Sequence, residues 1–257
     1  MVLLAITGIA AWILARPDAK PFAASCVATV GNTSFAIDPE QAANATTIAA
    51  EAHRQGLPAH AVSVGIATAL QESKLRNLSY GDRDSLGLFQ QRPSQGWGTP
   101  AQILQPTYAA ATFFHHLRKV AGWQALPIHV AAQRVQRSAD GSAYASWDTV
   151  SRIFAQGLTG QTPGGYSCRF PSIPRQTAST QQRLRAESIA ALGSDALGPA
   201  VTGSYGWLVA SWLISRAPTY SIEQVSYAGW LWTPHAATWV RATTPRPSGV
   251  TYALRPV

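Results

Sequence analysis

The chain has 257 residues, enough for one large domain or two modest ones that each bury a core. Hydrophobic residues make up 46% of it and charged residues only 12%, which excludes a disordered polyelectrolyte. Twenty Lys and Arg against twelve Asp and Glu give a formal net charge of +8, which favours an anionic partner. The basic residues are scattered, without a run of five or more, so we expect no nucleic-acid partner.

Residues 1–25 begin with the uncharged apolar stretch MVLLAITGIAAWILA. It is shorter than the roughly twenty apolar residues that span a bilayer, but it matches the roughly seven to fifteen of a signal h-region. It lacks the basic residues that usually precede such a region. Their absence would also fit a longer anchor that is truncated at its start. We therefore predict a signal sequence or an uncleaved membrane anchor over residues 1–25. The protein would then act outside the cytoplasm, in the cell envelope, membrane-anchored or secreted.

The chain has two cysteines, Cys26 and Cys168. In an exported protein such a pair favours one disulfide, with two unrelated buried thiols as the alternative. The bridge would close a domain over residues 26–170 and stabilise it by very roughly 4 kcal/mol in the chain-entropy model. Two cysteines without a histidine-rich motif do not make a zinc site, so neither a metal nor another cofactor is expected.

The first domain is predicted to be almost entirely helical after a short β-prone segment at residues 27–37. Asp38-Pro39-Glu40-Gln41 is a strong helix start, because Asp38 can cap, Pro39 suits the first helical position and Gln41 can reach back to the cap. Residues 99–102 form another capped start, and residues 76–98 are predicted as an ordered loop. The expected helices cover residues 39–54, 58–75, 106–120, 128–137 and 143–158.

A linker rich in Gly, Thr and Pro over residues 159–167 and a loose composition at 171–180 predict a domain boundary near residue 170. Beyond it we expect helices at 181–192 and 206–216 and short strands at 224–227, 229–233 and 237–242. Residues 171–257 are therefore predicted to form a small α+β domain. Its dense tryptophans and tyrosines form either a core or an exposed binding face. An envelope protein, if one binds, is expected to use this domain.

Glu72 is the candidate catalytic residue of the first domain. Glycoside cleavage needs a carboxylic acid that can give its proton to the leaving glycosidic oxygen. The segment ALQESKL puts Glu72 on the last turn of an apolar helix, where burial and the negative end of the helix dipole both favour a protonated acid. The alternative, which position alone would favour, is a solvated surface glutamate.

Glu72-Ser73 is followed fifteen residues later by Gly87-Leu88-Phe89-Gln90. This pairing resembles the ES and GLMQ motifs of SLT-type lytic transglycosylases and goose-type lysozymes. The resemblance covers about residues 41–147, strongly only 67–93, and residues 106–114 resemble the helix that closes the family's substrate groove. It implies a mostly α, lysozyme-like domain that cleaves peptidoglycan between MurNAc and GlcNAc, with Glu72 as general acid.

The stretch GLFQQRPSQGWGTP also looks like actinobacterial envelope proteins and phage-tail lysozyme modules. Some of these proteins are labelled heavy metal transporters. The sequence does not support that label, because it has neither several apolar spans nor a metal-binding motif.

The chain departs from this family at residues 132–138, AQRVQRS, where many transglycosylases carry Ala-Tyr-Asn. The tyrosine that would steady the acid is therefore missing at the matching place. A lytic transglycosylase needs only one acid, whereas an inverting hydrolase needs a second carboxylate to activate water. Asp82 and Asp84 resemble the acidic loop before GLMQ in goose-type lysozymes, and either is a candidate for that catalytic role. Otherwise they bind Arg83 or cap the turn.

The candidate substrate-binding residues lie on and around this loop. Gly87 permits close approach of the backbone to a sugar, and Gln90 offers an amide to an N-acetyl group, unless it braces the loop. Ser73 either orients Glu72 or bonds back to its helix. The aromatic residues that could stack on sugars, or else pack in the core, are Trp97, Tyr108, Trp123 and Tyr144. The predicted substrate-binding set is Ser73, Gly87, Gln90, Gln91, Trp97 and Tyr108.

Three classes of function remain open. The first is a membrane-anchored muramidase or lytic transglycosylase. The second is a catalytically inactive module that only binds peptidoglycan, and the third is a scaffold for envelope assembly.

Overall fold

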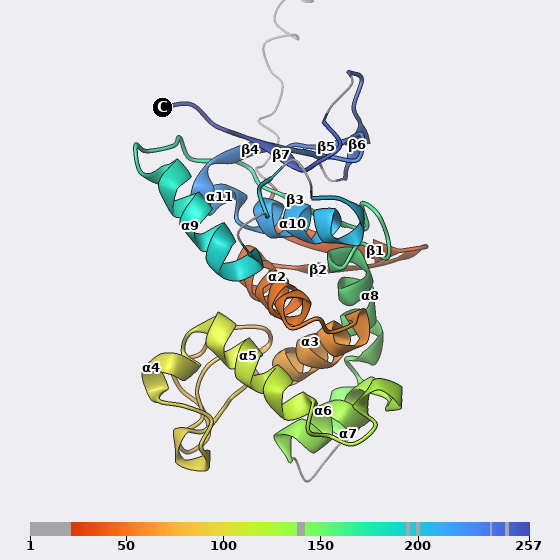
Figure 1. Ribbon diagram of the computed structural model, residues 1–257, viewed down its shortest axis with the longest axis vertical. Coiled ribbons are helices and arrows are strands. Elements are labelled where there is room, and N and C mark those ends of the chain that lie inside the picture. Colours follow the sequence, from red (N-terminus) through yellow and green to blue (C-terminus); the bar gives the residue numbers. More distant parts are fainter. Residues whose placement is uncertain (1–21, 138–141, 194–195, 199–200, 237, 245–246) are drawn as a thin grey trace, which may run out of the picture.

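The computed structural model describes residues 22–137, 142–193, 196–198, 201–236, 238–244 and 247–257. A mostly helical part is followed by an α+β part, in agreement with the predicted order (Figure 1). Of the predicted signal or anchor, residues 1–21 lie outside the described residues, and Ser25 already begins the first strand. Within the described segments, no helix is long and apolar enough to cross a membrane.

The first sheet joins the two ends of the helical part. Its strands are β1 (Ser25–Val30), β2 (Thr33–Ile37) and β3 (Tyr166–Arg169), in the antiparallel order β2-β1-β3. The linker prediction was therefore wrong for Tyr166 and Ser167, whose strand forms only by pairing with a distant segment. Cys26 lies directly opposite Cys168, and the two form the predicted disulfide. Such a bridge indicates an oxidising compartment.

The helices of this part begin where the capping signals predicted them. In α2 (Pro39–Arg54) the Asp38 side chain accepts a hydrogen bond from the Gln41 backbone, and the Gln41 side chain accepts one from Asp38. The predicted helix 143–158 is interrupted at residues 146–147. The remaining elements are α3 (Ala59–Ser73), η1 (Pro93–Gln95), α4 (Pro100–Ile103), α5 (Pro106–Leu117), η2 (Trp123–Ala125), α6 (Ile128–Gln136), α7 (Ser142–Ala145) and α8 (Asp148–Leu158).

The C-terminal part contains helices and a second antiparallel sheet, in the order β6-β5-β4-β7. The two predicted helices are present, whereas β7 and α11 were not predicted. The predicted strand 237–242 is reduced to β6, and residue 237 lies outside the described residues. The elements are α9 (Thr180–Leu192), α10 (Gly203–Ser215), α11 (Ala217–Tyr220), β4 (Ile222–Tyr227), β5 (Trp230–Trp232), β6 (Val240–Arg241) and β7 (Thr251–Leu254).

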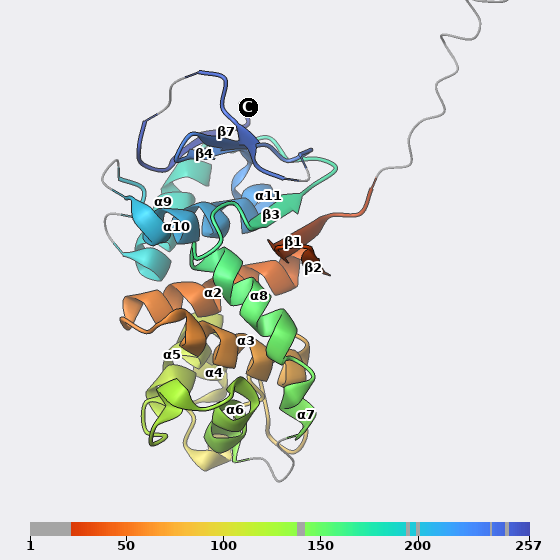
Figure 2. The ribbon, with the colours of Figure 1, turned by 90° about the vertical axis from the view of Figure 1, so that its right-hand side faces the viewer.

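The two parts share one cluster of buried side chains. Helix α10 packs against α2, β3 and β4, and it lies between α2 and the second sheet (Figure 2). The indole nitrogens of Trp232 and Trp239 donate to the carbonyls of Cys168 and Tyr166, at 2.7 and 2.8 Å. Most tryptophans of the C-terminal part are buried, so they form core rather than an exposed face.

Removal of the disulfide in a Cys26→Ser/Cys168→Ser variant should lower the free energy of unfolding by about 2–5 kcal/mol. The bridge closes a loop of 142 residues, so its loss gives the unfolded chain more freedom than the folded one. Urea denaturation of the variant, compared with the wild type in reducing agent, measures this difference. If the urea midpoint of the variant and that of the reduced wild type both equalled the midpoint of the oxidised wild type, the prediction would be contradicted.

Candidate active site

The end of α3 is fixed by a left-handed turn of two residues. Lys74 and Leu75 have φ of 56° and 60°, a conformation that is uncommon for residues other than glycine. The Lys74 carbonyl accepts a hydrogen bond from the Gln41 amide at 2.8 Å, and the Leu75 carbonyl accepts one from the Asn44 amide at 2.7 Å. Because both donors lie on α2, the last turn of α3 is anchored to a second helix.

Glu72 lies half-buried on that last turn, beside α7 and the start of α8. The hydroxyl of Tyr144, a residue only 2% exposed, donates a hydrogen bond to Glu72 Oε1 at 2.5 Å. One residue earlier, Gln71 Oε1 accepts from the indole of Trp147 at 2.9 Å. The Lys74 ammonium lies 4.6 Å from the centroid of the Trp147 ring. The carboxyl group is thus oriented by a tyrosine that is itself held in place by burial.

The loop with the GLFQ sequence is attached to the same end of α3. Ser73 Oγ donates to the Leu88 carbonyl at 2.7 Å, and the Gln136 amide of α6 donates to the Phe89 carbonyl at 2.8 Å. Phe89 is buried and its ring stacks on Phe113 of α5 at 4.6 Å between centroids. The loop is therefore held by three helices at once.

Ser73 and Gln91, both predicted to bind substrate, lie inside the protein. Ser73 is 5% exposed, and its hydroxyl bonds to Ala69 of its own helix as well as to the loop. Gln91 is 1% exposed and its amide donates to the Ala109 carbonyl of α5 at 3.0 Å. Both side chains support the loop from within and do not face a surface that a glycan reaches.

Gly87 and Gln90 shape the loop itself. Gly87 has φ of +74°, and a Cβ there would lie 2.6 Å from the Ile103 carbonyl oxygen. Glycine is thus required at position 87 because the backbone there lies close to α4. The sequence had suggested that it allows a sugar to come close. Gln90 is half-buried, and its amide donates to the carbonyls of Tyr80 and Gly87, both at 3.2 Å. Of the two roles that the sequence left open, the structure therefore shows Gln90 bracing the loop.

Trp97 and Tyr108 remain the partly exposed aromatic residues of the predicted set. The Trp97 ring lies 4.2 Å from the His116 ring, centroid to centroid, and is tilted by 32°. Tyr108 covers Gly98, where a Cβ would lie 2.7 Å from the tyrosine hydroxyl. The two rings therefore have fixed positions with some of their surface open, as stacking on a sugar requires.

The two acidic candidates for a second catalytic role differ sharply. Asp84 accepts hydrogen bonds from Arg92 Nε at 2.7 Å and from the Ser94 backbone at 2.8 Å. Bonds from Ser94, and then from Arg92, hold the pKa of Asp84 well below its usual range, which makes it a weak base. The side chain of Asp82 is 91% exposed and lies 3.8 Å from Arg83. Asp84 thus clamps the loop, whereas Asp82 is solvated and pairs only with its neighbour Arg83.

Sequence reasoning missed the contact between Tyr144 and Glu72. The resemblance placed the steadying tyrosine at residues 132–138, and Tyr144 was considered only for stacking on a sugar. No local signal could reveal the contact, because it joins residues 72 positions apart.

Among the side chains that the structure describes, no three His, Cys, Asp or Glu residues gather as a metal site. Comparison of the chain with models of known protein families finds no match, and comparison with curated proteins finds none either.

An Asp84→Asn variant should loosen residues 84–94, because it loses the ion pair with Arg92. A carboxylate with a lowered pKa stabilises the fold above its unfolded pKa, near pH 4, and loses that effect only as the pH falls through the folded pKa. The variant's amide protection should therefore fall at pH 7 and at pH 5, with the difference disappearing in strong acid. Hydrogen exchange measures this, with Asp82→Asn as control. Equal protection in wild type and Asp84→Asn at pH 7 would contradict the assignment.

Proposed function

We propose that the chain cleaves the glycan strands of peptidoglycan between MurNAc and GlcNAc, with Glu72 as the general acid. The observation that carries the proposal is the hydrogen bond from the buried Tyr144 hydroxyl to the Glu72 carboxyl group. Tyr144 would orient the acid in this chain. In the lytic transglycosylases that the chain resembles, the tyrosine with this role lies at another place in the sequence. The hydrogen bond from Ser73 to the GLFQ loop also supports the proposal. It brings together the Glu-Ser pair and the GLFQ loop, the two motifs on which the resemblance rests.

The reaction uses Glu72 twice. First it gives its proton to the glycosidic oxygen, and the bond from that oxygen to C1 of MurNAc breaks. The resulting carboxylate then takes the proton of the muramyl 6-hydroxyl, whose oxygen bonds to C1 and closes a 1,6-anhydro ring. Tyr144 holds the carboxyl group in one orientation through both steps. The acid is regenerated without water.

This single-acid route, that of a lytic transglycosylase, is favoured over the hydrolytic route of a muramidase. A hydrolase of the inverting kind needs a carboxylate that activates water. Asp84 is bound to Arg92 and Ser94 and has a lowered pKa, which makes it unsuited to that task. Asp82 is left as the candidate base of the hydrolytic alternative.

The disulfide supports action outside the cytoplasm, where peptidoglycan lies. We propose that the protein works in the cell envelope, held there by residues 1–25 or released as a secreted protein. Residues 171–257 remain the part that an envelope protein would contact.

A Glu72→Gln variant should fold normally and release at least about 10²-fold less soluble product from purified peptidoglycan, because it cannot donate the proton. The matched control is Glu223→Gln, which changes a similarly half-buried glutamate on β4 and should leave release unchanged. Mass spectrometry of the wild-type products should show 1,6-anhydro ends. Reducing ends would indicate a muramidase, and wild-type binding without any product would favour an inactive binding module.

A Tyr144→Phe variant should release product about 10- to 150-fold more slowly, because a hydrogen bond to the acid contributes about 1.5–3 kcal/mol. Tyr227→Phe is the matched control, since Tyr227 is 3% exposed and its hydroxyl donates to the Gly203 carbonyl. Initial rates on the same substrate measure both variants. Equal rates for Tyr144→Phe and wild type would show that the contact does not orient the acid.

A further inference from the structure

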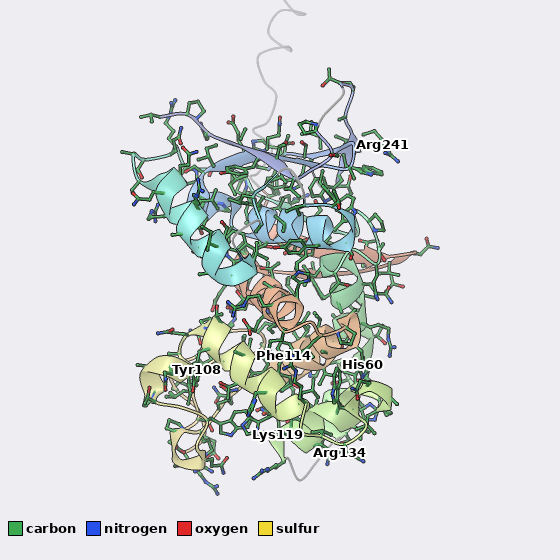
Figure 3. All side chains as sticks on the ribbon, in the orientation of Figure 1. His60, Tyr108, Phe114, Lys119, Arg134 and Arg241 are labelled. Carbon is green, nitrogen blue, oxygen red and sulfur yellow. A yellow bond between two sulfur atoms is a disulfide. The ribbon has the colours of Figure 1, made fainter. Side chains whose placement is uncertain are left out.

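Four exposed basic residues gather where the end of α5 meets α6. We call them the basic surface; they are His115, Lys119, Arg134 and Arg137. Figure 3 shows Lys119, just beyond α5, and Arg134, on α6, at the same end of the molecule. His115 is on the last turn of α5 and Lys119 follows two residues after that helix ends. Arg134 is on the last turn of α6, and Arg137 directly follows that helix in a left-handed conformation with φ of 54°.

The charge of the basic surface is not balanced within the described part of the chain. There, no ion pair joins any of its four side chains to a carboxylate. The pKa of His116 is lowered by burial first and then by the charges of Lys119, His115 and Arg137, which means that these charges lie close around it. Unbalanced positive charge of this kind attracts an anionic partner.

The basic surface adjoins the candidate active site. Trp97, a candidate for sugar stacking, lies against His116 in the middle of it. Arg137 directly follows Gln136, whose amide bonds to the Phe89 carbonyl of the GLFQ loop. A polymer bound along this loop would therefore pass next to the basic surface.

We propose that the basic surface binds the free carboxylates of the peptide stems that project from a peptidoglycan strand. This inference rests on the proposed function and names the part of the same substrate that is bound beside the cleavage site. Peptide stems are favoured because every stretch of peptidoglycan glycan carries them, whereas phosphate-containing polymers are attached to it only at intervals. Arginine suits the task because its guanidinium can hold a carboxylate through two hydrogen bonds.

The test measures binding to purified, insoluble peptidoglycan in a Glu72→Gln background, in which the polymer stays intact. Lys119→Gln/Arg134→Gln/Arg137→Gln should raise the Kd about tenfold, since each exposed ion pair contributes only a few-fold. The control, Arg152→Gln/Arg183→Gln/Arg185→Gln, removes three exposed cations elsewhere and should bind almost as the background does. Lys119→Arg/Arg134→Lys/Arg137→Lys keeps the charges but loses the two-bond geometry of both arginines, so its Kd should lie between those of the background and the triple Gln variant.

The substrate is then varied to identify the anion. Removal of the stems with an amidase should weaken binding of the background protein about tenfold and abolish the difference between the two triple Gln variants. Chemical removal of phosphate-containing polymers should leave that difference intact. Equal binding by both triple variants overturns the proposal, and so does a difference that only phosphate removal abolishes. Product release by the chain with native Glu72 is assayed separately: binding that depends on the basic surface without any product would refute the proposed cleavage and keep the binding site.

Discussion

The left-handed turn at Lys74 and Leu75 is the constraint on which the candidate site depends. Such a conformation costs roughly 1–2 kcal/mol per residue when the residue is not glycine. Here the cost is offset by the full burial of the Leu75 side chain and by the hydrogen bonds from Gln41 and Asn44 to the two carbonyls. The last turn of a helix usually frays, and this one does not have the freedom to do so, because α2 holds it. Glu72, on this turn, therefore has a fixed backbone.

The Glu-Ser pair divides two tasks between neighbouring residues. Successive side chains on a helix point about 100° apart, so Glu72 and Ser73 cannot face the same way. Ser73 points inward and holds the GLFQ loop through the Leu88 carbonyl, while Glu72 is left half-exposed beside Tyr144. One short sequence thus carries both the acid and the attachment of the loop next to it. This arrangement gives Glu72 and the GLFQ loop neighbouring positions in the fold.

The C-terminal part supports the helical part instead of standing apart from it. The buried guanidinium of Arg216 donates to the hydroxyls of Thr46 and Thr47 on α2, and its Nε meets Glu187 of α9. Leaving such a charge buried without partners would be costly, so these bonds tie α9 and α10 to the helix that also anchors Glu72. The disulfide acts in the same direction by joining β1 to β3.

Local signals were enough to predict the capping box at Asp38, most helices and the position of Glu72 at the end of α3, because each depends on residues a few positions apart. The pairing of Cys26 with Cys168 was also predictable, because the chain has two cysteines. Tertiary structure alone decided the partner of Glu72, the commitment of Asp84 to Arg92 and the strand β3. These features depend on contacts between segments brought together by packing. Tyr144 in particular reaches Glu72 because α7 packs against α3, a contact that joins residues 72 positions apart and leaves no periodic trace in the sequence.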